Sequence, residues 1–254
     1  MKLTREKLLE MDLHRKVSQN YSHIREKNRQ ARYYKDYWIK SILSLLDKKP
    51  KKILDYGCGT GILCPYIKAK FNSSYTGIDI SKDMLKLAKA KFPEAKLLQM
   101  DGESLKFKPN SFDAVIVFGS LHHVPDPKKA VMEIRKVLSS NGVLLISEPT
   151  SNRFIGALRK QFYKSKKHFS PSHKSFLHHE LILLIKNHGF KIKEIRHFGL
   201  FAFPFGLPDI VPVVKYVPLP LLQLLVRIDE FLLKIPVVNS FRFATTILAE
   251  KQEQ

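Results

Sequence analysis

The chain has 254 residues, 44% of them hydrophobic, which is enough to bury one well-filled core, so we expect a single domain over residues 1–254. Its two cysteines, Cys58 and Cys64, exclude a disulfide framework and match no metal-ligand spacing, so we expect a reducing, cytoplasmic compartment and no bound metal. The 44 basic against 23 acidic residues give a net charge of +21, which attracts nucleic acid, anionic membranes or phosphorylated substrates without distinguishing among them.

Residues 1–48 are predicted to form a helical extension. Residues 1–12 include acids and no apolar run, so we expect no signal peptide. Residues 1–52 hold 15 Lys and Arg against 6 Asp and Glu, with aromatic residues interleaved. The apolar residues at helical spacing are Tyr34, Trp38, Ile42 and Leu45. This spacing favours a helix packed beside the first strand, and the alternative is a helix closing over a ligand that Tyr21 or Tyr33 touches.

A buried strand at residues 52–55 leads into a turn with glycine at every second position, Gly57-Cys58-Gly59-Thr60-Gly61. Glycine permits a positive φ and close approach of a ligand to the backbone, and a helix is predicted to open at Gly61. The spacing G-x-G-x-G differs from the dinucleotide fingerprint G-x-G-x-x-G. The Asp55 carboxylate before the turn would repel a pyrophosphate and suits a ligand that carries an ammonium and a sulfonium. A glycine-rich turn in some other α/β protein is the alternative.

Three further strands follow, and an acid comes after two of them. Residues 75–79 form a predicted strand that ends at Asp79, about 20 residues beyond the turn, where a carboxylate can accept both ribose hydroxyls. Ser81 is a plausible N-cap for the next helix, which includes Met84. The third strand, residues 95–100, is followed by Asp101. Residues 112–118 are a continuous apolar run, as in a central parallel strand.

The rest of the chain continues the alternation. We predict a helix over residues 128–138, a turn at Asn141-Gly142, and a fifth strand over 143–147. A helix from residue 181 to Gly189 and strands over 191–198 and 243–249 follow. This alternation alone predicts a doubly wound α/β sheet.

Together these motifs resemble class I S-adenosylmethionine-dependent methyltransferases, closest to the ubiquinone/menaquinone-biosynthesis-type group, in which Leu-His-His-Val followed by Asp-Pro is familiar. The resemblance covers residues 50–150 closely and 176–198 and 241–251 more loosely. It implies a Rossmann-like seven-stranded sheet of order 3-2-1-4-5-7-6 with the last strand antiparallel. It also implies S-adenosyl-L-methionine as cofactor, a cofactor-binding core at 49–150, and contact of Asp101 with the adenine amino group. The expected cofactor-binding residues are Asp55, Gly57, Cys58, Gly59, Gly61, Asp79, Ile80, Met84, Asp101, Gly102, Glu103, Phe118 and Tyr21.

Two segments of the C-terminal part, residues 151–254, are unusual. Residues 153–174 are strongly basic with little apolar period, which is typical of a solvated surface loop or a phosphate-contacting loop. Residues 199–240 form an apolar insertion with six prolines where a short hairpin loop is usual. Within it, apolar residues share one predicted helical face, and the acids Asp229 and Glu230 lie mostly away from that face. The residues of the face are Leu224, Leu225, Ile228, Leu232 and Ile235. Core packing, a lid over an apolar substrate and a membrane-seated patch are all compatible with this pattern.

The reaction expected from the resemblance is an in-line displacement at the sulfonium methyl, in which positioning supplies much of the acceleration. A hydroxyl or acidic-carbon acceptor also needs a base. His123, and after it His122, are the candidates, since both follow the fourth strand; the alternative is that one of them only packs the loop. The further candidates are His173, His178 and His179.

Three functions stay open on the sequence. The first is methylation of a small, amphiphilic or lipid-linked acceptor at an anionic membrane, which the insertion and the cationic surface suit. The second is methylation of a base in tRNA or other RNA, which the charge favours. The fourth strand, however, ends in Phe118-Gly119-Ser120-Leu121 instead of the Asn/Asp-Pro-Pro-aromatic motif of amino-group base methylases. The third is a cofactor-binding regulator without activity.

Overall fold

The computed structural model describes residues 4–9, 11–12, 27–47, 49–152, 176–206 and 216–253. Tyr21, His173 and the basic segment 153–174 lie outside the described residues, and so does the middle of the 199–240 insertion. The predictions made for them are therefore not tested by the structure.

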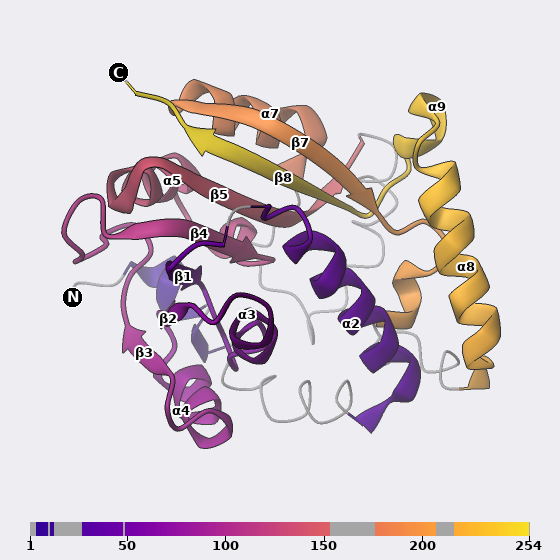
Figure 1. The fold of residues 1–254 in the computed structure, drawn as a ribbon, viewed down its shortest axis with the longest axis horizontal. Helices are drawn as coiled ribbons and strands as arrows, with labels where there is room; N and C mark the ends of the chain where they lie inside the picture. Colours follow the sequence, from indigo (N-terminus) through magenta and orange to yellow (C-terminus); the bar gives the residue numbers. More distant parts are fainter. Residues whose placement is uncertain are drawn as a thin grey trace.

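A twisted sheet forms the centre of the molecule, with strand order β3-β2-β1-β4-β5-β8-β7 and the short β6 paired to β5 (Figure 1). β8 runs antiparallel to both β5 and β7, whereas β1 to β5 are parallel. The predicted order and the predicted antiparallel last strand are confirmed. The strands are β1 (Lys52–Tyr56), β2 (Ser74–Asp79), β3 (Lys96–Gln99), β4 (Phe112–Phe118), β5 (Leu138–Ser151), β6 (Phe176–Leu177), β7 (Phe190–Phe198) and β8 (Ala244–Lys251).

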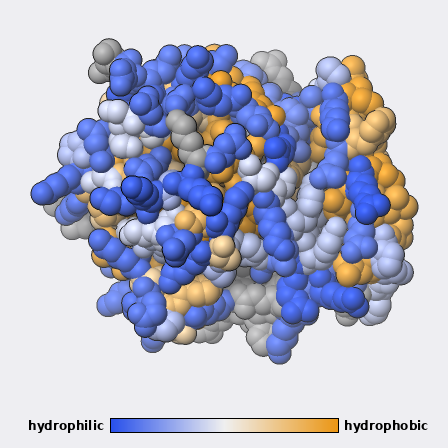
Figure 2. Space-filling view, in the orientation of Figure 1, coloured by the Kyte–Doolittle hydropathy of each residue, from blue (hydrophilic) through white to orange (hydrophobic). Residues whose placement is uncertain are grey.

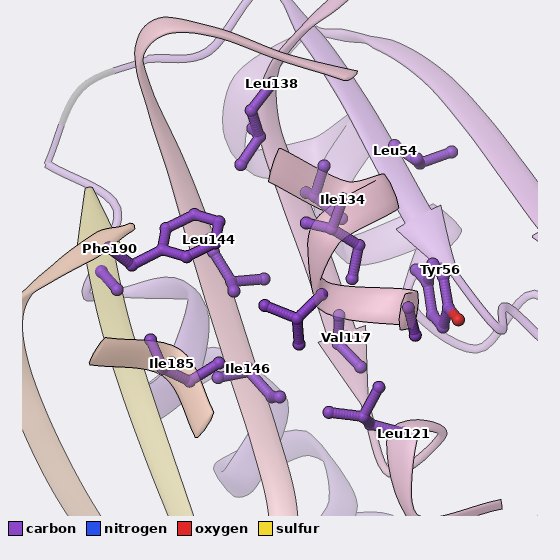
Figure 3. Close-up of a cluster of buried hydrophobic side chains, with 14 of the residues drawn as sticks. Leu54, Tyr56, Val117, Leu121, Ile134, Leu138, Leu144, Ile146, Ile185 and Phe190 are labelled. Carbon is purple, nitrogen blue, oxygen red and sulfur yellow. The ribbon is translucent and has the colours of Figure 1, made fainter. Parts of the chain in front are cut away.

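Helices cover both faces of the sheet. The apolar faces of α5 (Pro127–Val137) and α7 (His178–Asn187) pack on one side, where Ile134 and Ile185 meet Leu144 and Ile146 of β5 (Figure 3). On the other side, α2 (Arg29–Leu43) and α3 (Cys64–Phe71) bury Ile42 and Ile67 against the sheet. α4 (Lys82–Lys91) contacts β2 and β3, and Ser81 caps it by accepting the Met84 N–H, as predicted. These layers make the doubly wound fold that the alternation predicts.

Two local boundaries differ from the prediction. α3 begins at Cys64 and not at Gly61, because Gly59 and Gly61 have φ of 52° and 76°, which an α-helix does not allow. β5 starts five residues before Val143 and continues past Ser147. The turn predicted at residues 139–142 is a bulge within it, where the pairing register with β4 shifts, and Asn141 carries the positive φ of 59°.

The predicted packing of the N-terminal helix is confirmed. In α2, Tyr34 and Ile42 are buried, and Trp38 is half-buried with its ring centroid 5.2 Å from that of Phe118 at the end of β4. Tyr33 is half-buried and packs beside the cluster around Tyr34. Trp38 therefore links the N-terminal helix to the carboxyl edge of the sheet.

The described part of the insertion contains a short 3-10 turn (Phe203–Gly206), α8 (Leu219–Leu232) and α9 (Pro236–Asn239). α8 buries Leu222, Val226 and Asp229, not the predicted stripe: Leu224 is 53% and Ile228 36% exposed. The prediction was wrong because it treated Asp229 as a solvent-facing acid. Its carboxylate instead accepts three backbone N–H groups of residues 200–202, at 2.8 to 3.0 Å.

Candidate functional site

The carboxyl ends of the parallel strands meet at one edge of the sheet. Asp55 lies beside Gly77 of β2 and Ile116 of β4, and Asp79 ends β2 next to Gln99 of β3. The acids predicted at successive strand ends are therefore brought together at the place where open α/β sheets bind ligands.

The glycine turn after β1 requires glycine for two separate reasons. Gly57 has φ of 69°, and a Cβ there would lie 2.4 Å from the Cβ of Ser120. Gly59 has φ of 52°, and no neighbouring atom lies within 4 Å of where its Cβ would be, so that side of the turn is open. A ligand can approach the backbone here without meeting a side chain.

Asp79 joins the turn to the start of α4. Its Oδ2 accepts the Gly59 N–H at 2.9 Å, and its Oδ1 accepts the Ser81 N–H at 2.8 Å. Each carboxylate oxygen has further acceptor capacity, so the fixed carboxylate can also accept ribose hydroxyls. The residue that the sequence assigns to ribose binding thus also holds the turn in place.

Asp55 lies beneath the turn with 1% of its surface exposed. Burial raises the pKa of its carboxyl to about 7, and the charge of Asp79 adds to this rise. The Tyr75 hydroxyl, which donates a hydrogen bond to Oδ2 at 2.6 Å, lowers the pKa and so opposes the rise. A positively charged ligand would favour the ionised form of Asp55. The pair Asp55 and Asp79 therefore fits a cationic cofactor and disfavours an anionic one.

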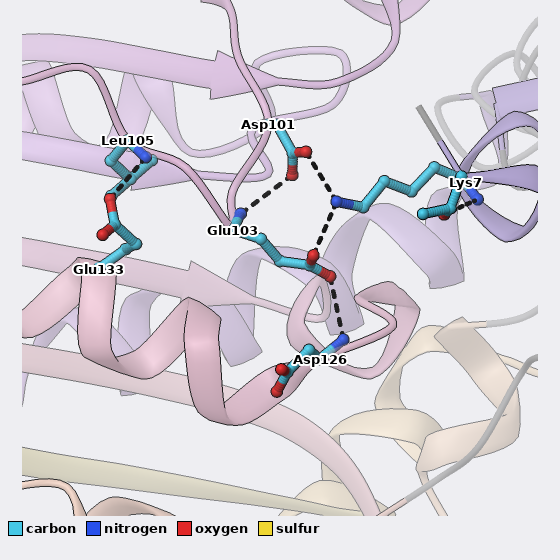
Figure 4. Close-up of polar contacts among 7 residues, drawn as sticks. Lys7, Asp101, Glu103, Leu105, Asp126 and Glu133 are labelled. Carbon is cyan, nitrogen blue, oxygen red and sulfur yellow. Dashed lines mark hydrogen bonds and ion pairs between the residues drawn. The ribbon is translucent and has the colours of Figure 1, made fainter. Parts of the chain in front are cut away.

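Lys7, from the helical residues 5–9, lies against the acids that follow β3. Its Nζ donates to Asp101 Oδ2 at 2.7 Å and to Glu103 Oε2 at 2.8 Å, and the lysine is only 8% exposed (Figure 4). Glu103 also accepts the Asp126 N–H at 3.0 Å. Sequence reasoning missed Lys7, because nothing in the local pattern marks a contact across 94 residues.

The other predicted cofactor residues surround this edge. Ile80, Met84, Gly102 and Phe118 are half-buried, and Gly61 and Cys58 are buried. Burial raises the pKa of the Cys58 thiol, which keeps it neutral.

The two histidines after β4 lie on a 3-10 turn, Leu121–His123, that a buried carboxylate holds. Glu148, fully buried within β5 just beyond the residue that pairs with the end of β4, accepts the N–H groups of Ser120 and Leu121 on Oε1 at 3.0 and 2.8 Å. Its Oε2 lies 2.6 Å from His122 Nδ1. The sequence favours His123 as base, whereas the structure gives His122 the carboxylate partner.

Glu148 has a pKa raised to about 7, chiefly by burial, which its backbone N–H donors and the charge of His123 oppose. A carboxylate on Nδ1 fixes the tautomer and orientation of an imidazole and leaves Nε2 to take up a proton. Sequence reasoning did not assign Glu148 a role, although it directly follows the predicted fifth strand, residues 143–147.

Of the further histidines, His178 begins α7 and His179 is exposed. His178 Nδ1 lies 3.1 Å from the Thr245 hydroxyl, and Thr245 is paired with Glu148 across β5 and β8. His178 therefore lies near Glu148, with Thr245 of β8 between them.

Within the described ranges no three His, Cys, Asp or Glu side chains are grouped so that they could hold a metal ion. A search of the same residues finds no helix with both the length and the apolar character needed to cross a membrane.

Known proteins resemble this chain in sequence and in fold. A family described as "Methyltransferase domain" matches residues 54–146. The demethylmenaquinone methyltransferase of Thermotoga maritima is 32% identical over 133 residues, covering 50% of this chain and 58% of that protein. The ubiquinone/menaquinone biosynthesis C-methyltransferase UbiE of Campylobacter jejuni is 32% identical over 184 residues, covering 62% of this chain and 78% of that protein.

Among solved structures, a phosphoethanolamine N-methyltransferase of Haemonchus contortus, in complex with phosphomonomethylethanolamine and S-adenosylhomocysteine, has a TM-score of 0.62. It is 20% identical, and the match covers 86% of this chain and 53% of that one. At this identity the likeness concerns the fold.

Proposed function

The chain belongs to the S-adenosylmethionine-dependent methyltransferases, and we propose that it methylates a small, apolar or lipid-linked acceptor at oxygen or carbon. S-adenosylmethionine is the cofactor, and methyl transfer is the reaction class. The single observation that carries the proposal is the His122–Glu148 pair at 2.6 Å, because a hydroxyl or acidic-carbon acceptor must lose a proton.

The geometry of the strand ends supports the following roles for the cofactor residues. We assign the ribose hydroxyls to Asp79, the adenine amino group to Asp101, and the backbone of the turn around Gly59 to the amino-acid part. Asp55 contributes negative charge beneath the turn. Ile80, Met84 and Phe118 would supply the apolar contacts, and Lys7 keeps the two acids after β3 together.

The bound cofactor supplies an electrophilic methyl group on a sulfonium. This chain's residues align the acceptor for in-line attack and remove its proton. Glu148 holds Nδ1 of His122, so Nε2 of that ring is the proton acceptor we propose. His123, whose ring centroid lies 3.9 Å from that of His122, is the alternative base.

Aromatic side chains support an apolar acceptor. Trp38 packs edge-on against Phe118 at the end of β4, and its centroid lies 6.0 Å from that of Phe203 in the insertion. Phe203 in turn stacks on Phe243 just before β8, with centroids 4.5 Å apart. An apolar wall thus joins the site edge to the insertion. The names of the two relatives point to the same class of acceptor.

A peripheral contact with an anionic membrane also belongs to this proposal. The exposed apolar residues of α8 and α9 gather at one edge of the molecule (Figure 2). They are Leu221, Leu224, Ile228, Phe231, Ile235 and Val237. With a net charge of +21, such a face suits a lipid-linked acceptor presented at a negative surface.

The alternative acceptor is an RNA base, which the net charge favours. The proposal is tested by incubating the protein with methyl-labelled S-adenosylmethionine and either a demethylated naphthoquinol in detergent or total RNA. We expect label in the organic extract. Label in the RNA alone would overturn the acceptor assignment, and His122→Ala should retain cofactor binding while losing transfer in either case.

A further inference from the structure

A row of polar side chains extends from Glu148 across the sheet. Glu148 of β5 pairs with Thr245 of β8, and Thr245 pairs with His197 of β7. Residues directly opposite in neighbouring strands point to the same face, so these three side chains lie on one side of the sheet. Strands are about 4.8 Å apart, which places His197 roughly 10 Å from Glu148.

Two imidazoles meet above this row. His178, at the start of α7, lies 3.1 Å from the Thr245 hydroxyl through Nδ1. The ring centroids of His178 and His197 are 5.2 Å apart at an interplanar angle of 70°. Thr245 itself is fully buried and bonds Thr150 of β5 at 2.8 Å. The row thus continues from the proposed base into a second polar cluster.

Arg242 lies next to Phe243, whose N–H bonds the Phe198 carbonyl beside His197, and it brings a buried positive charge close enough to lower the pKa of both His178 and His197. It is 6% exposed, and its Nη1 donates to the backbone and side-chain oxygens of Asn239. Burial lowers its pKa to about 10, which leaves the guanidinium charged at neutral pH. Among the described residues, no carboxylate pairs with Arg242, and its Nε has no hydrogen-bond partner. A buried charge of this kind is normally paired.

The surroundings show the same lack of negative charge. Burial first, and then the charge of Arg242, lower the pKa values of His178 and His197 to about 4. The Nδ1 of His197 is buried with no partner in the described part of the chain. The described residues of the cluster therefore offer donors and positive potential, and no acid is among the causes that shift the pKa values of its two histidines.

We infer that Arg242, His178 and His197 form a binding site for a negatively charged oxygen group carried by the methyl acceptor. A phosphate or a carboxylate is the matching chemistry, since the planar guanidinium binds either through paired N–H groups. This inference rests on the proposed function. His197 lies roughly 10 Å from Glu148, so the site could hold the far end of an acceptor whose reacting atom lies beside His122.

The test is calorimetric titration of the full chain, saturated with S-adenosylmethionine, with phenyl phosphate, benzoate and benzyl alcohol at constant ionic strength. We expect one or both anions to bind and the uncharged alcohol to bind at least about tenfold more weakly, the loss of one charge-assisted contact. Arg242→Gln should reduce anion affinity by about tenfold or more. The matched control Arg227→Gln removes an exposed charge from α8 and should change nothing.

Equal anion affinity in Arg242→Gln and Arg227→Gln would overturn the inference, and so would equal binding of phenyl phosphate and benzyl alcohol. If Arg242→Gln fails to bind S-adenosylmethionine, it is misfolded, and His197→Gln is used in its place. We expect His197→Gln to bind the anion several-fold more weakly. Unchanged anion affinity in His197→Gln would contradict the site. The titration requires no turnover. A chain that binds phenyl phosphate through Arg242 but methylates no apolar acceptor would therefore refute the proposed function and leave the anion site in place.

Discussion

Asp79 fixes the ligand-binding edge through both of its carboxylate oxygens, one on the glycine turn and one on the start of α4. We predict that Asp79→Ala weakens S-adenosylmethionine binding by about 100-fold or more, because it would remove the proposed hydrogen bonds to both ribose hydroxyls, each worth roughly 1.5–3 kcal/mol at a charged acceptor. Calorimetric titration measures this loss.

The control for this titration is Asp83→Ala, which removes an exposed acid from the first turn of the same helix. His123→Ala should bind the cofactor as the natural chain does and turn over more slowly. Unchanged affinity in Asp79→Ala would mean that the cofactor lies elsewhere.

The raised pKa of Glu148 leads to a prediction about the pH dependence of the proposed reaction. Because burial raises its pKa to about 7, the carboxylate loses its charge as the pH falls through neutrality, and His122 then loses its anionic partner. We predict that turnover rises with pH and levels off above about 7, and falls about tenfold per unit below it. Glu148→Gln should lower turnover by about 100-fold and abolish this limb, as measured by kcat at saturating substrates from pH 5.5 to 8.5.

The affinity for S-adenosylmethionine serves as the control and should be unchanged in Glu148→Gln. Glu148 accepts hydrogen bonds from the turn that carries His122 and His123, and not from the proposed cofactor residues. An identical pH profile in Glu148→Gln would assign the ionisation to another group. Because His122 and Glu148 are coupled, the profile reports the pair.

At the scale of residues, the sequence predicted the acids at the strand ends and the positive φ of the glycines. It could do so because both depend on neighbours within a few positions. It could not predict that Lys7 bridges Asp101 and Glu103, or that Arg242 has no carboxylate partner among the residues that the structure describes. Those facts depend on segments distant along the chain that the fold brings together.

At the scale of elements, Asp229 attaches α8 to the end of β7. Its buried carboxylate accepts the N–H groups of Leu200, Phe201 and Ala202, and of these three contacts the one to Ala202 is buried and the other two are partly buried. We predict that Asp229→Ala lowers the free energy of unfolding by about 3 kcal/mol, because it leaves one buried and two partly buried N–H donors unsatisfied. Urea denaturation gives the measurement.

The neighbouring Glu230→Ala is the matched control. That exposed acid accepts a surface hydrogen bond from the Tyr37 hydroxyl at 3.0 Å, and its removal should lower the free energy of unfolding by at most about 1 kcal/mol. Asp229→Asn should fall between the two, because an amide has a single acceptor oxygen. Equal stability of Asp229→Ala and Glu230→Ala would contradict the role of Asp229.

α8 also shows where a hydrophobic pattern misleads. Periodicity assigned Leu224 and Ile228 to one apolar face but could not say which face is buried. The burial of Asp229 decides that question, because three backbone donors offset its desolvation and rotate Leu222 and Val226 inward. The order of the sheet, by contrast, follows from regular alternation and short connections, which the sequence displays directly.

At the scale of the whole molecule, net charge and the exposed apolar face of α8 lead to different salt dependences. Phosphate contacts release counterions, so RNA binding weakens steeply as salt rises. Apolar burial is insensitive to salt in this range. A membrane contact that depends on α8 therefore persists under conditions that remove an RNA complex.

We predict that the protein floats with phosphatidylglycerol vesicles and that binding persists from 0.1 to 0.5 M NaCl, whereas any RNA gel shift is lost. Leu224→Glu with Phe231→Glu should weaken vesicle binding by about 100-fold, since burial of each side chain contributes roughly 1.5–3 kcal/mol. The control Met132→Glu alters an exposed apolar residue of α5, 59% exposed and on another element, and should float as the natural chain does. The opposite result would be that vesicle binding falls with salt as steeply as RNA binding and that the double variant floats like the natural chain. Charge alone would then govern association with the vesicles, and the exposed apolar face of α8 would not be a membrane contact.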